Sequence, residues 1–336
     1  MQIIDLVPDL RPTILAARQV RDERNTLARF LPYKEGQTVS YRLGRQRRLD
    51  QTVPVRAIDA PAIPIRRPGV VDIKGDLPAV TPIEDLSEQD LTNEMVMAMQ
   101  LNGLNVDWLP SVNSAAGRVA LTVDNTFEAM RGQVLSTLAL ALTAEDGVTH
   151  DVSFAADASQ IVTVTTPWNT TGDPFKDLEA AHEAHLDRAG GPAGIMLTTS
   201  RVKRTLLTKL QALFPQQPVG QTSLSGYLAD RGLPDVYTYD RTFTAYDGTK
   251  SRVYPEGYAT FLPAEGEPVG RTELGVTQEA VQQVQRGTLN AAEAPGVTVV
   301  TLGRDNPVQR AVKAAAIGMP VIHDIEAVSV IRSIFG

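Results

Sequence analysis

The chain has 336 residues, of which 43% are apolar and 21% are charged, a balance that excludes a disordered protein. Its formal net charge of −7 argues against a nucleic-acid binder of the usual basic kind. Because it contains no cysteine, disulfides, thiolate metal sites and cysteine nucleophiles are excluded.

The start of the sequence predicts an N-terminal arm over residues 1–35. Within residues 12–30 the apolar positions form a modest helical pattern that needs another surface to stay ordered. Proline and charged residues interrupt this region, so a signal peptide is not expected. No apolar stretch is long enough for a membrane-spanning helix. We therefore expect a protein that is intracellular and soluble when made, with no membrane partner.

Residues 36–82 predict a long basic β-hairpin. Residues 38–43 and 69–80 are β-prone, and the segment between them is rich in proline and arginine. The hairpin has no apolar stripe wide enough to make a core, so it must find a partner elsewhere. Its basic residues are Arg42, Arg45, Arg47, Arg48, Arg56, Arg66, Arg67 and Lys74.

An acidic segment follows the hairpin. Between Gly75 and Gly117 there is no lysine or arginine, whereas seven carboxylates occur: Asp76, Glu84, Asp85, Glu88, Asp90, Glu94 and Asp107. In a symmetric assembly, the hairpin of one copy can lie on the acidic segment of the next. The predicted contact residues are Arg45, Arg47, Arg48, Arg56, Arg66 and Arg67 on the hairpin and Glu84, Asp85, Glu88 and Asp90 on the acidic segment. The alternative is that the arginines only keep a long hairpin soluble.

The strongest helical pattern lies at about residues 111–138, after a shorter amphipathic helix expected within residues 83–103. Its apolar positions recur at steps of three and four: Val112, Ala116, Val119, Val123, Phe127, Met130, Val134 and Leu138. Ser111 is the expected N-cap, and residues 145–147 are expected to stop the helix. Gly117 and Gly132 each cost about 1 kcal/mol relative to alanine, so we expect tight packing or bending to compensate. This helix is expected to be a spine for a sheet.

The remainder of the sequence predicts a mixed α+β region. Strands are expected at residues 147–154 and 160–166, and helices at residues 174–190 and 199–213. Residues 236–262 alternate as strands, with Asp247 and Gly248 suited to a type I′ hairpin turn. The tail predicts strands at residues 297–302, 319–325 and 327–335 around a helix at residues 309–318.

Enzymatic signatures are weak. His182 and His185 flank Glu183 on a predicted helix, but they are three residues apart where the zinc-peptidase signature needs four. We interpret them as part of a solvated helical face. The nucleophile-elbow and phosphate-loop motifs are missing from the sequence. His323 is expected to be structural, and Trp108 and Trp168 are expected to anchor cores. The sequence therefore predicts no enzyme, no cofactor and no metal site.

In this order of segments the chain resembles the major capsid proteins of tailed phages, specifically the phage lambda major head protein (capsid protein E) family with the Hong Kong 97-type fold. The residues that carry the resemblance are 61–86, which resemble the extended loop; 127–140 and 143–148, the end of the long helix and its turn; 194–207, the start of an axial-domain helix; and 306–335, the closing segment. Their order and spacing matter more than any single piece.

The resemblance implies an α+β fold with an N-arm, an extended β-hairpin loop, a long spine helix, and peripheral and axial domains. The expected division is residues 1–35, N-terminal arm; 36–82, extended loop; 83–185, peripheral domain; 186–300, axial domain; and 301–336, C-terminal strands that return to the sheets.

The implied function is a structural head protein that self-assembles into hexamers and pentamers of an icosahedral shell around phage DNA. The resemblance implies location in the virion after assembly in the host cytoplasm. Its partners would be further copies of the chain, with scaffolding, decoration and portal proteins as further candidates, and double-stranded DNA enclosed without sequence-specific binding. The alternatives are an encapsulin-like compartment shell and, more distantly, a metal-dependent hydrolase.

Overall fold

The computed structural model describes residues 24–36, 40–46, 70–93, 112–143, 149–154, 158–216, 218–264, 267–287, 296–305 and 308–335. The chain divides into two units. The first comprises the described residues within Met1–Tyr41, Asp76–Arg131 and Arg271–Pro320. The second comprises those within Arg42–Gly75, Gly132–Gly270 and Val321–Gly336.

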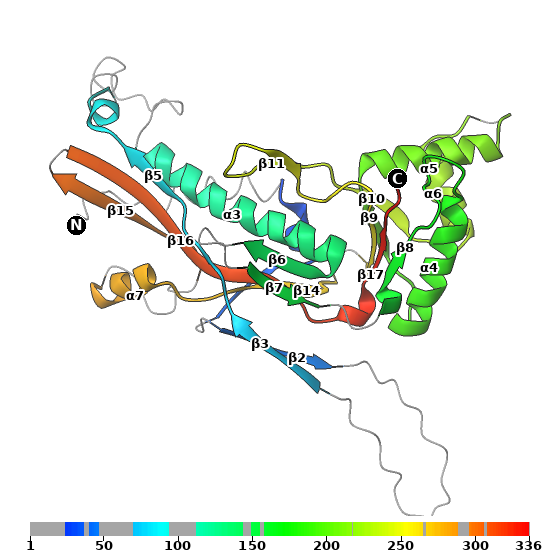
Figure 1. Cartoon of the computed structure of the whole chain (residues 1–336), viewed down its shortest axis with the longest axis horizontal. Coiled ribbons are helices and arrows are strands. Elements are labelled where there is room, and N and C mark those ends of the chain that lie inside the picture. Colours follow the sequence, from blue (N-terminus) through cyan, green and yellow to red (C-terminus); the bar gives the residue numbers. More distant parts are fainter. Residues whose placement is uncertain are drawn as a thin grey trace, which may run out of the picture. The chain divides into compact units, whose positions relative to one another are not determined.

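The predicted spine helix is confirmed as α3, Val112–Thr137 (Figure 1). All the predicted stripe positions except Val112 are buried. The expected stop at residues 145–147 is wrong, because the chain turns at Leu138, which has a positive φ of 53°. Strand β6, Ala139–Thr143, follows at once and pairs antiparallel with β7, Thr149–Ser153.

Strand β16, Val308–Ile322, is the centre of the sheet in the first unit. One edge of β16 pairs with β15, Thr298–Asp305, and with β14, Gly270–Leu274; β1, Tyr33–Glu35, lies parallel beside β14. The other edge pairs with β4, Ala79–Val80, and β5, Ile83–Leu86. Figure 1 shows α3 running alongside β5 and β16.

The helix predicted at residues 309–318 is therefore wrong. An alanine-rich apolar run favours a helix locally. Here the backbone groups of that run are paired on both edges by segments that are distant in the sequence, and Val312 and Ala314–Ala316 are fully buried. Tertiary pairing and burial override the local propensity.

The second unit contains a five-stranded sheet in the order β10, β9, β13, β17 and β8. The strand bounds are β8, Ile161–Thr163; β9, Ile195–Thr198; β10, Asp235–Thr238; β13, Ala259–Leu262; and β17, Ser329–Arg332. The strands predicted around residues 150 and 163 thus belong to two different sheets, since β7 pairs with β6 and β8 with β17.

Three helices cover this sheet: α4, Pro174–Ala189; α5, Ser200–Leu213; and α6, Gln221–Asp230. The predicted helices at residues 174–190 and 199–213 are confirmed. Helix α4 begins at Asp173, whose side chain accepts hydrogen bonds from two backbone amides, and ends at Gly190 with φ 70°. Trp168 anchors the core under these helices, as predicted, and is fully buried. Trp108 lies outside the described residues.

Two further hairpins complete the fold. Strands β11, Thr242–Thr244, and β12, Lys250–Arg252, are antiparallel. The type I′ turn predicted between them is wrong, because only Gly248 of the turn has a positive φ and its amide bonds to the carbonyl of Ala245 at 2.9 Å. The connection is therefore a hairpin loop longer than the two-residue type I′ turn, and it ends in a glycine with the left-handed conformation. Strands β2, Ser40–Gln46, and β3, Val70–Asp76, pair with each other, which confirms the two strands of the basic hairpin.

The remaining elements are short. The predicted N-terminal helix falls partly on residues 24–30, where the structure has the 3-10 turn η1, Thr26–Arg29, and its other residues lie outside the described part. The other 3-10 turns are η2, Ala158–Gln160, and η4, Ile325–Ala327, and helix α7 is Gln278–Gln285. Of the helix expected within residues 83–103, the structure describes residues 88–93 as helical, preceded by β5.

Candidate assembly interface

The acidic segment begins on β5, where Glu84 points to the spine helix. The guanidinium of Arg118 on α3 donates to both carboxylate oxygens of Glu84, from Nε at 3.0 and 3.2 Å and from Nη2 at 2.5 Å. This hydrogen bond raises the pKa of Arg118. Glu84, one of the predicted contact residues, is therefore already paired within its own chain.

Asp90 has a local partner too. Its carboxylate accepts from the hydroxyl of Ser87 at 2.6 Å and from the Ser87 amide at 3.1 Å, while the Asp90 amide donates to the Ser87 hydroxyl. These hydrogen bonds lower the pKa of Asp90, with the bond from the Ser87 side chain as the largest cause. The arrangement is a capping box at the start of a helix. Asp90, the third residue of this helix, thus stabilises the helix start together with Ser87.

Asp85 and Glu88 differ from these two residues. Both are exposed, and neither has an ion-pair partner among the described residues. Asp85 lies on β5 opposite Ala311, so the strand fixes its position. Nearby, Ile83 is 52% exposed, which adds an apolar side chain to the same strand. Of the four predicted carboxylates, these two are available to another molecule.

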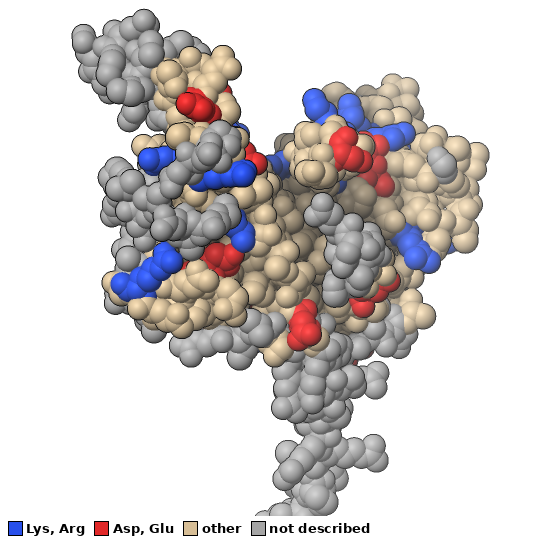
Figure 2. All heavy atoms as spheres, turned by 60° about the vertical axis from the view of Figure 1, so that its left-hand side comes forward, with Lys and Arg blue, Asp and Glu red and all other residues tan. Residues whose placement is uncertain are grey.

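The predicted basic residues are only partly described. Arg45 lies on β2, whereas Arg47, Arg48, Arg56, Arg66 and Arg67 lie outside the described residues. Figure 2 shows one face of the molecule, on which acidic and basic side chains lie interspersed.

Sequence reasoning missed a buried charged cluster between α3 and residues 25–33. Glu128 and Arg131 are completely buried and form an ion pair with an Oε2–Nη1 distance of 3.1 Å. Glu128 also accepts from the amide of Leu27 at 3.0 Å. Arg131 donates to the carbonyl of Leu31 at 3.1 Å and to the hydroxyl of Thr272 at 3.0 Å. This cluster attaches the segment before β1 to the spine helix.

The signal for this cluster was present in the sequence. Asp124, Glu128 and Arg131 recur at helical spacing directly beside the apolar stripe of α3, where a solvated face would be unusual. Asp124 accepts from the hydroxyl of Tyr33 at 3.1 Å, and the Arg131 guanidinium lies 4.2 Å from the centroid of the Tyr33 ring. The buried charges therefore have hydrogen-bonding and aromatic contacts.

The prediction of a solvated face for His182 and His185 is wrong. Both side chains are buried, with stacked rings 6.2 Å apart that pack edge-on against Phe261. Nδ1 of His185 lies 2.7 Å from the hydroxyl of Ser329. Burial lowers the pKa of both imidazoles, that of His185 to about 4, with smaller contributions from Arg188 and His182. The two histidines are part of a core.

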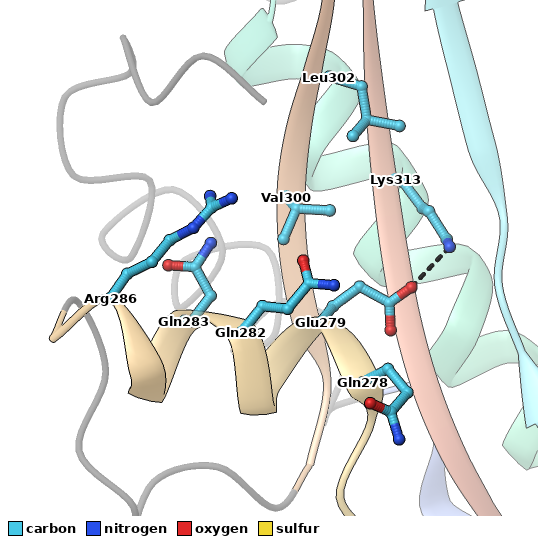
Figure 3. A pocket seen from close by; sticks show the side chains of 8 residues that line it. All are labelled: Gln278, Glu279, Gln282, Gln283, Arg286, Val300, Leu302 and Lys313. Carbon is cyan, nitrogen blue, oxygen red and sulfur yellow. Dashed lines mark hydrogen bonds and ion pairs between the residues drawn. The ribbon is translucent and has the colours of Figure 1, made fainter. Parts of the chain in front are cut away.

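A small pocket lies between α7 and the strands β15 and β16 (Figure 3). Its volume is about 140 Å³, below the range of roughly 300–1,000 Å³ that is typical of small-molecule sites. Its lining residues are Gln278, Glu279, Gln282, Gln283, Arg286, Val300, Leu302 and Lys313. Lys313 pairs with Glu279 at 2.6 Å across the pocket. These glutamines and this ion pair form no recognisable catalytic set.

Two further properties of the described residues bear on function. They contain no group of three or more side chains that could hold a metal ion. None of the helices in the described ranges is long and apolar enough to cross a membrane.

A long helix beside a sheet, a second sheet covered by helices and a separate two-stranded hairpin define a shell protein of the Hong Kong 97 type. Residues 21–331 match the family described as phage major capsid protein E. The chain therefore belongs to this family, and it is a structural protein of the phage head and not an enzyme. This membership favours the capsid function over the encapsulin-like and hydrolase alternatives.

Solved structures share the fold at low sequence identity. A protein assigned as a prophage capsid protein of Escherichia coli CFT073 has a TM-score of 0.59 and 13% identity, over 94% of this chain and 98% of that one. A phage-related protein from Bordetella bronchiseptica RB50 has a TM-score of 0.56 and 12% identity, over 99% and 98% of the two chains. The virus-like particle protein of Pyrococcus furiosus has a TM-score of 0.50 and 13% identity, over 96% and 98%. Among functionally curated proteins, none has a significantly similar sequence.

Proposed function

We propose that copies of this chain form hexamers and pentamers of an icosahedral head, in which the β2–β3 hairpin of one copy lies over residues 83–90 of its neighbour. The observation that carries the proposal is the pair Asp85 and Glu88, which are exposed and have no partner among the described residues of their own chain. The hairpin brings the complementary charges, beginning with Arg45 on β2. The division into N-terminal arm, extended loop, peripheral domain, axial domain and returning C-terminal strands is part of this proposal.

Each ion pair of the proposed contact is weak, but the contact is repeated around the ring. A single exposed ion pair contributes about 0–1 kcal/mol. The same contact recurs at every subunit of a ring, so the charges set register and the choice of partner while apolar burial supplies affinity. The exposed Ile83 on β5 offers such apolar area.

The four predicted acidic residues contribute unequally to the proposed contact with the hairpin. Asp85 and Glu88 carry most of the contact to the arginines of the hairpin. Glu84 contributes less, because Arg118 already neutralises it. Asp90 contributes less, because its carboxylate already accepts hydrogen bonds from Ser87, the N-cap of its helix.

The proposal also covers the contents and the location of the shell. A net charge of −7 repels DNA, so the proposed head encloses double-stranded DNA without sequence-specific binding. Assembly in the host cytoplasm and contacts with scaffolding, decoration and portal proteins belong to the same proposal.

Charge reversal on the two surfaces tests the contact between hairpin and acidic segment. The double variants Asp85→Lys/Glu88→Lys and Arg47→Glu/Arg48→Glu should each reduce the fraction of protein in closed particles, measured by sedimentation and negative-stain microscopy. The variant that combines all four changes should recover particles, because the opposite charges face each other again. Asp230→Lys, at the exposed C-terminal end of α6, is the matched control and should assemble normally. Normal assembly of both double variants at ordinary salt sensitivity would show that the arginines only keep the hairpin soluble.

A further inference from the structure

The C-terminal half of α4 presents an acidic face to solvent. Glu183 and Asp187 are one helical turn apart, are exposed, and have no ion-pair partner among the described residues. Between them Leu186 is 37% exposed. The one cation of the last turn, Arg188, points inward and donates to the hydroxyl of Ser329 and to backbone carbonyls. This face, Glu183, Leu186 and Asp187, is called the α4 acidic face below.

Helix α5 presents the opposite charge. It contains Arg201, Lys203, Arg204 and Lys209 and no acidic residue. Two of these cations have partners within the chain: Arg201 pairs with Glu256 at 2.6 Å, and Lys209 donates to two backbone carbonyls at 2.7 and 2.9 Å. Lys203 and Arg204 have no such partner among the described residues. These two residues are called the α5 basic face.

The α4 acidic face includes a residue that its own helix does not favour. A helix N-terminus carries partial positive charge and disfavours cations, and a C-terminus disfavours anions. Lys203 and Arg204 are the fourth and fifth residues of α5, so they lie beyond its first turn and the helix dipole affects them little. Asp187 lies in the last turn of α4. Because Asp187 adds to the negative partial charge of its helix end, the α4 acidic face gains from contact with cations.

The two faces lie on helices that pack near opposite edges of the five-stranded sheet. Helix α4 packs against β17 and η2, toward the β8 edge of the sheet, whereas α5 and α6 pack against β10 at the opposite edge (Figure 1). No ion pair joins the two faces within the described part of the chain. Two different complementary patches on one subunit produce a head-to-tail contact, and such a contact closes into a ring when the rotation permits.

We propose that the α4 acidic face of one copy binds the α5 basic face of the next copy around the ring, with Leu186 buried between them. The inference rests on the proposed ring assembly, but it uses a surface separate from the β2–β3 hairpin. A second copy fits better than DNA because DNA would pair with the α5 basic face alone and would leave the α4 acidic face without a role. The contact sets the order of subunits around each ring.

Reciprocal charge reversal tests this proposal in the full-length protein. The acidic-face variant is Glu183→Lys/Asp187→Lys, and the basic-face variant is Lys203→Glu/Arg204→Glu. Each alone places like charges across every contact, so the yield of closed particles should fall about tenfold or more. The variant with all four changes should recover particles. Asp230→Lys again serves as the control, and thermal unfolding of each variant checks that the second unit still folds.

Mixing the two double variants provides a sharper result. Each double variant pairs correctly only with the other, so subunits must alternate around a ring. Even-membered rings then form and five-membered rings do not, and the mixture should give hexamers or open sheets in place of closed particles. Native mass spectrometry and microscopy distinguish these products.

The outcomes separate this proposal from the proposed function. Failure of the unmodified chain to form shells would contradict the proposed function itself. Shells from the unmodified chain and from both double variants in equal yield would overturn only the α4–α5 contact. Normal shells from the basic-face variant with reduced DNA retention would also overturn it and would assign the α5 basic face to DNA.

Discussion

Glu128 and Arg131, on the buried side of the spine helix, form an ion pair with an Oε2–Nη1 distance of 3.1 Å. Neither side chain is exposed to solvent. Buried pairs of this kind are costly to desolvate, but the removal of one partner is costlier still, because it leaves an uncompensated charge. In this chain the pair also holds the segment before β1 through the amide of Leu27 and the carbonyl of Leu31.

Arg131→Met is therefore expected to destabilise the unassembled subunit by about 3–5 kcal/mol, because Glu128 stays buried without its cation. Urea denaturation measures the change in the free energy of unfolding. Arg118→Ala is the control, since its ion pair with Glu84 is on the surface. It should cost no more than about 1 kcal/mol. Equal losses for the two variants would contradict the importance of the buried pair.

Gly132→Ala is expected to destabilise the subunit even though alanine favours helices. A Cβ at this position would lie 1.9 Å from the carbonyl oxygen of Val253, so the spine helix could not keep its contact with that segment. The cost should be at least about 1–3 kcal/mol, as for other overpacked sites. In α6, a Cβ on Gly226 would meet nothing within 4 Å. Gly226→Ala should instead stabilise by up to about 1 kcal/mol, and thermal unfolding compares the two variants.

The stability of the second unit is expected to fall in mild acid. The folded-state pKa of His185 is lowered from 6.5 to about 4, by burial first and then by Arg188 and His182. Below pH 6.5 the unfolded chain binds a proton that the folded chain does not bind until about pH 4, so stability is lost across this interval and not above it. The loss should reach up to about 3 kcal/mol. His185→Gln can keep a hydrogen bond to Ser329 without titrating, and it should flatten the pH dependence of urea unfolding; an unchanged slope would contradict this origin.

Gly248→Ala tests the turn between β11 and β12. Gly248 has φ 83° and no atom near its would-be Cβ, so the cost is backbone strain alone, about 1–2 kcal/mol. Gly191→Ala also meets open space, but its φ is not positive, and it should change the unfolding free energy by less than about 0.5 kcal/mol. A type I′ turn would predict positive φ at Asp247 as well, and Asp247→Ala would then be as damaging as Gly248→Ala.

Local periodicity was sufficient for some elements. The steps of three and four from Val112 to Leu138 predicted α3, because the buried face of a helix appears in the sequence as apolar residues at this spacing. Helix α4 was predicted with its glycine stop. The complementary charges of the hairpin and acidic segment were visible as well, but which carboxylates remain available was not. For Glu84 that distinction depends on Arg118, which is 34 residues away and reaches Glu84 only in the folded chain. The capping box of Ser87 and Asp90 has a local signature at three-residue spacing, which sequence reasoning missed.

The sequence alone determined the order of segments, and with it the family. Both that order and the runs of basic and acidic residues are properties of the linear chain and do not depend on which segments meet. Only the tertiary structure decided that residues 308–322 are the central strand β16, since their partners in β5 and β15 come from distant parts of the chain. The same holds for the burial of His185 and of the Glu128–Arg131 pair. Local patterns describe how one element faces the core, whereas strand pairing and charge burial depend on which distant segments meet.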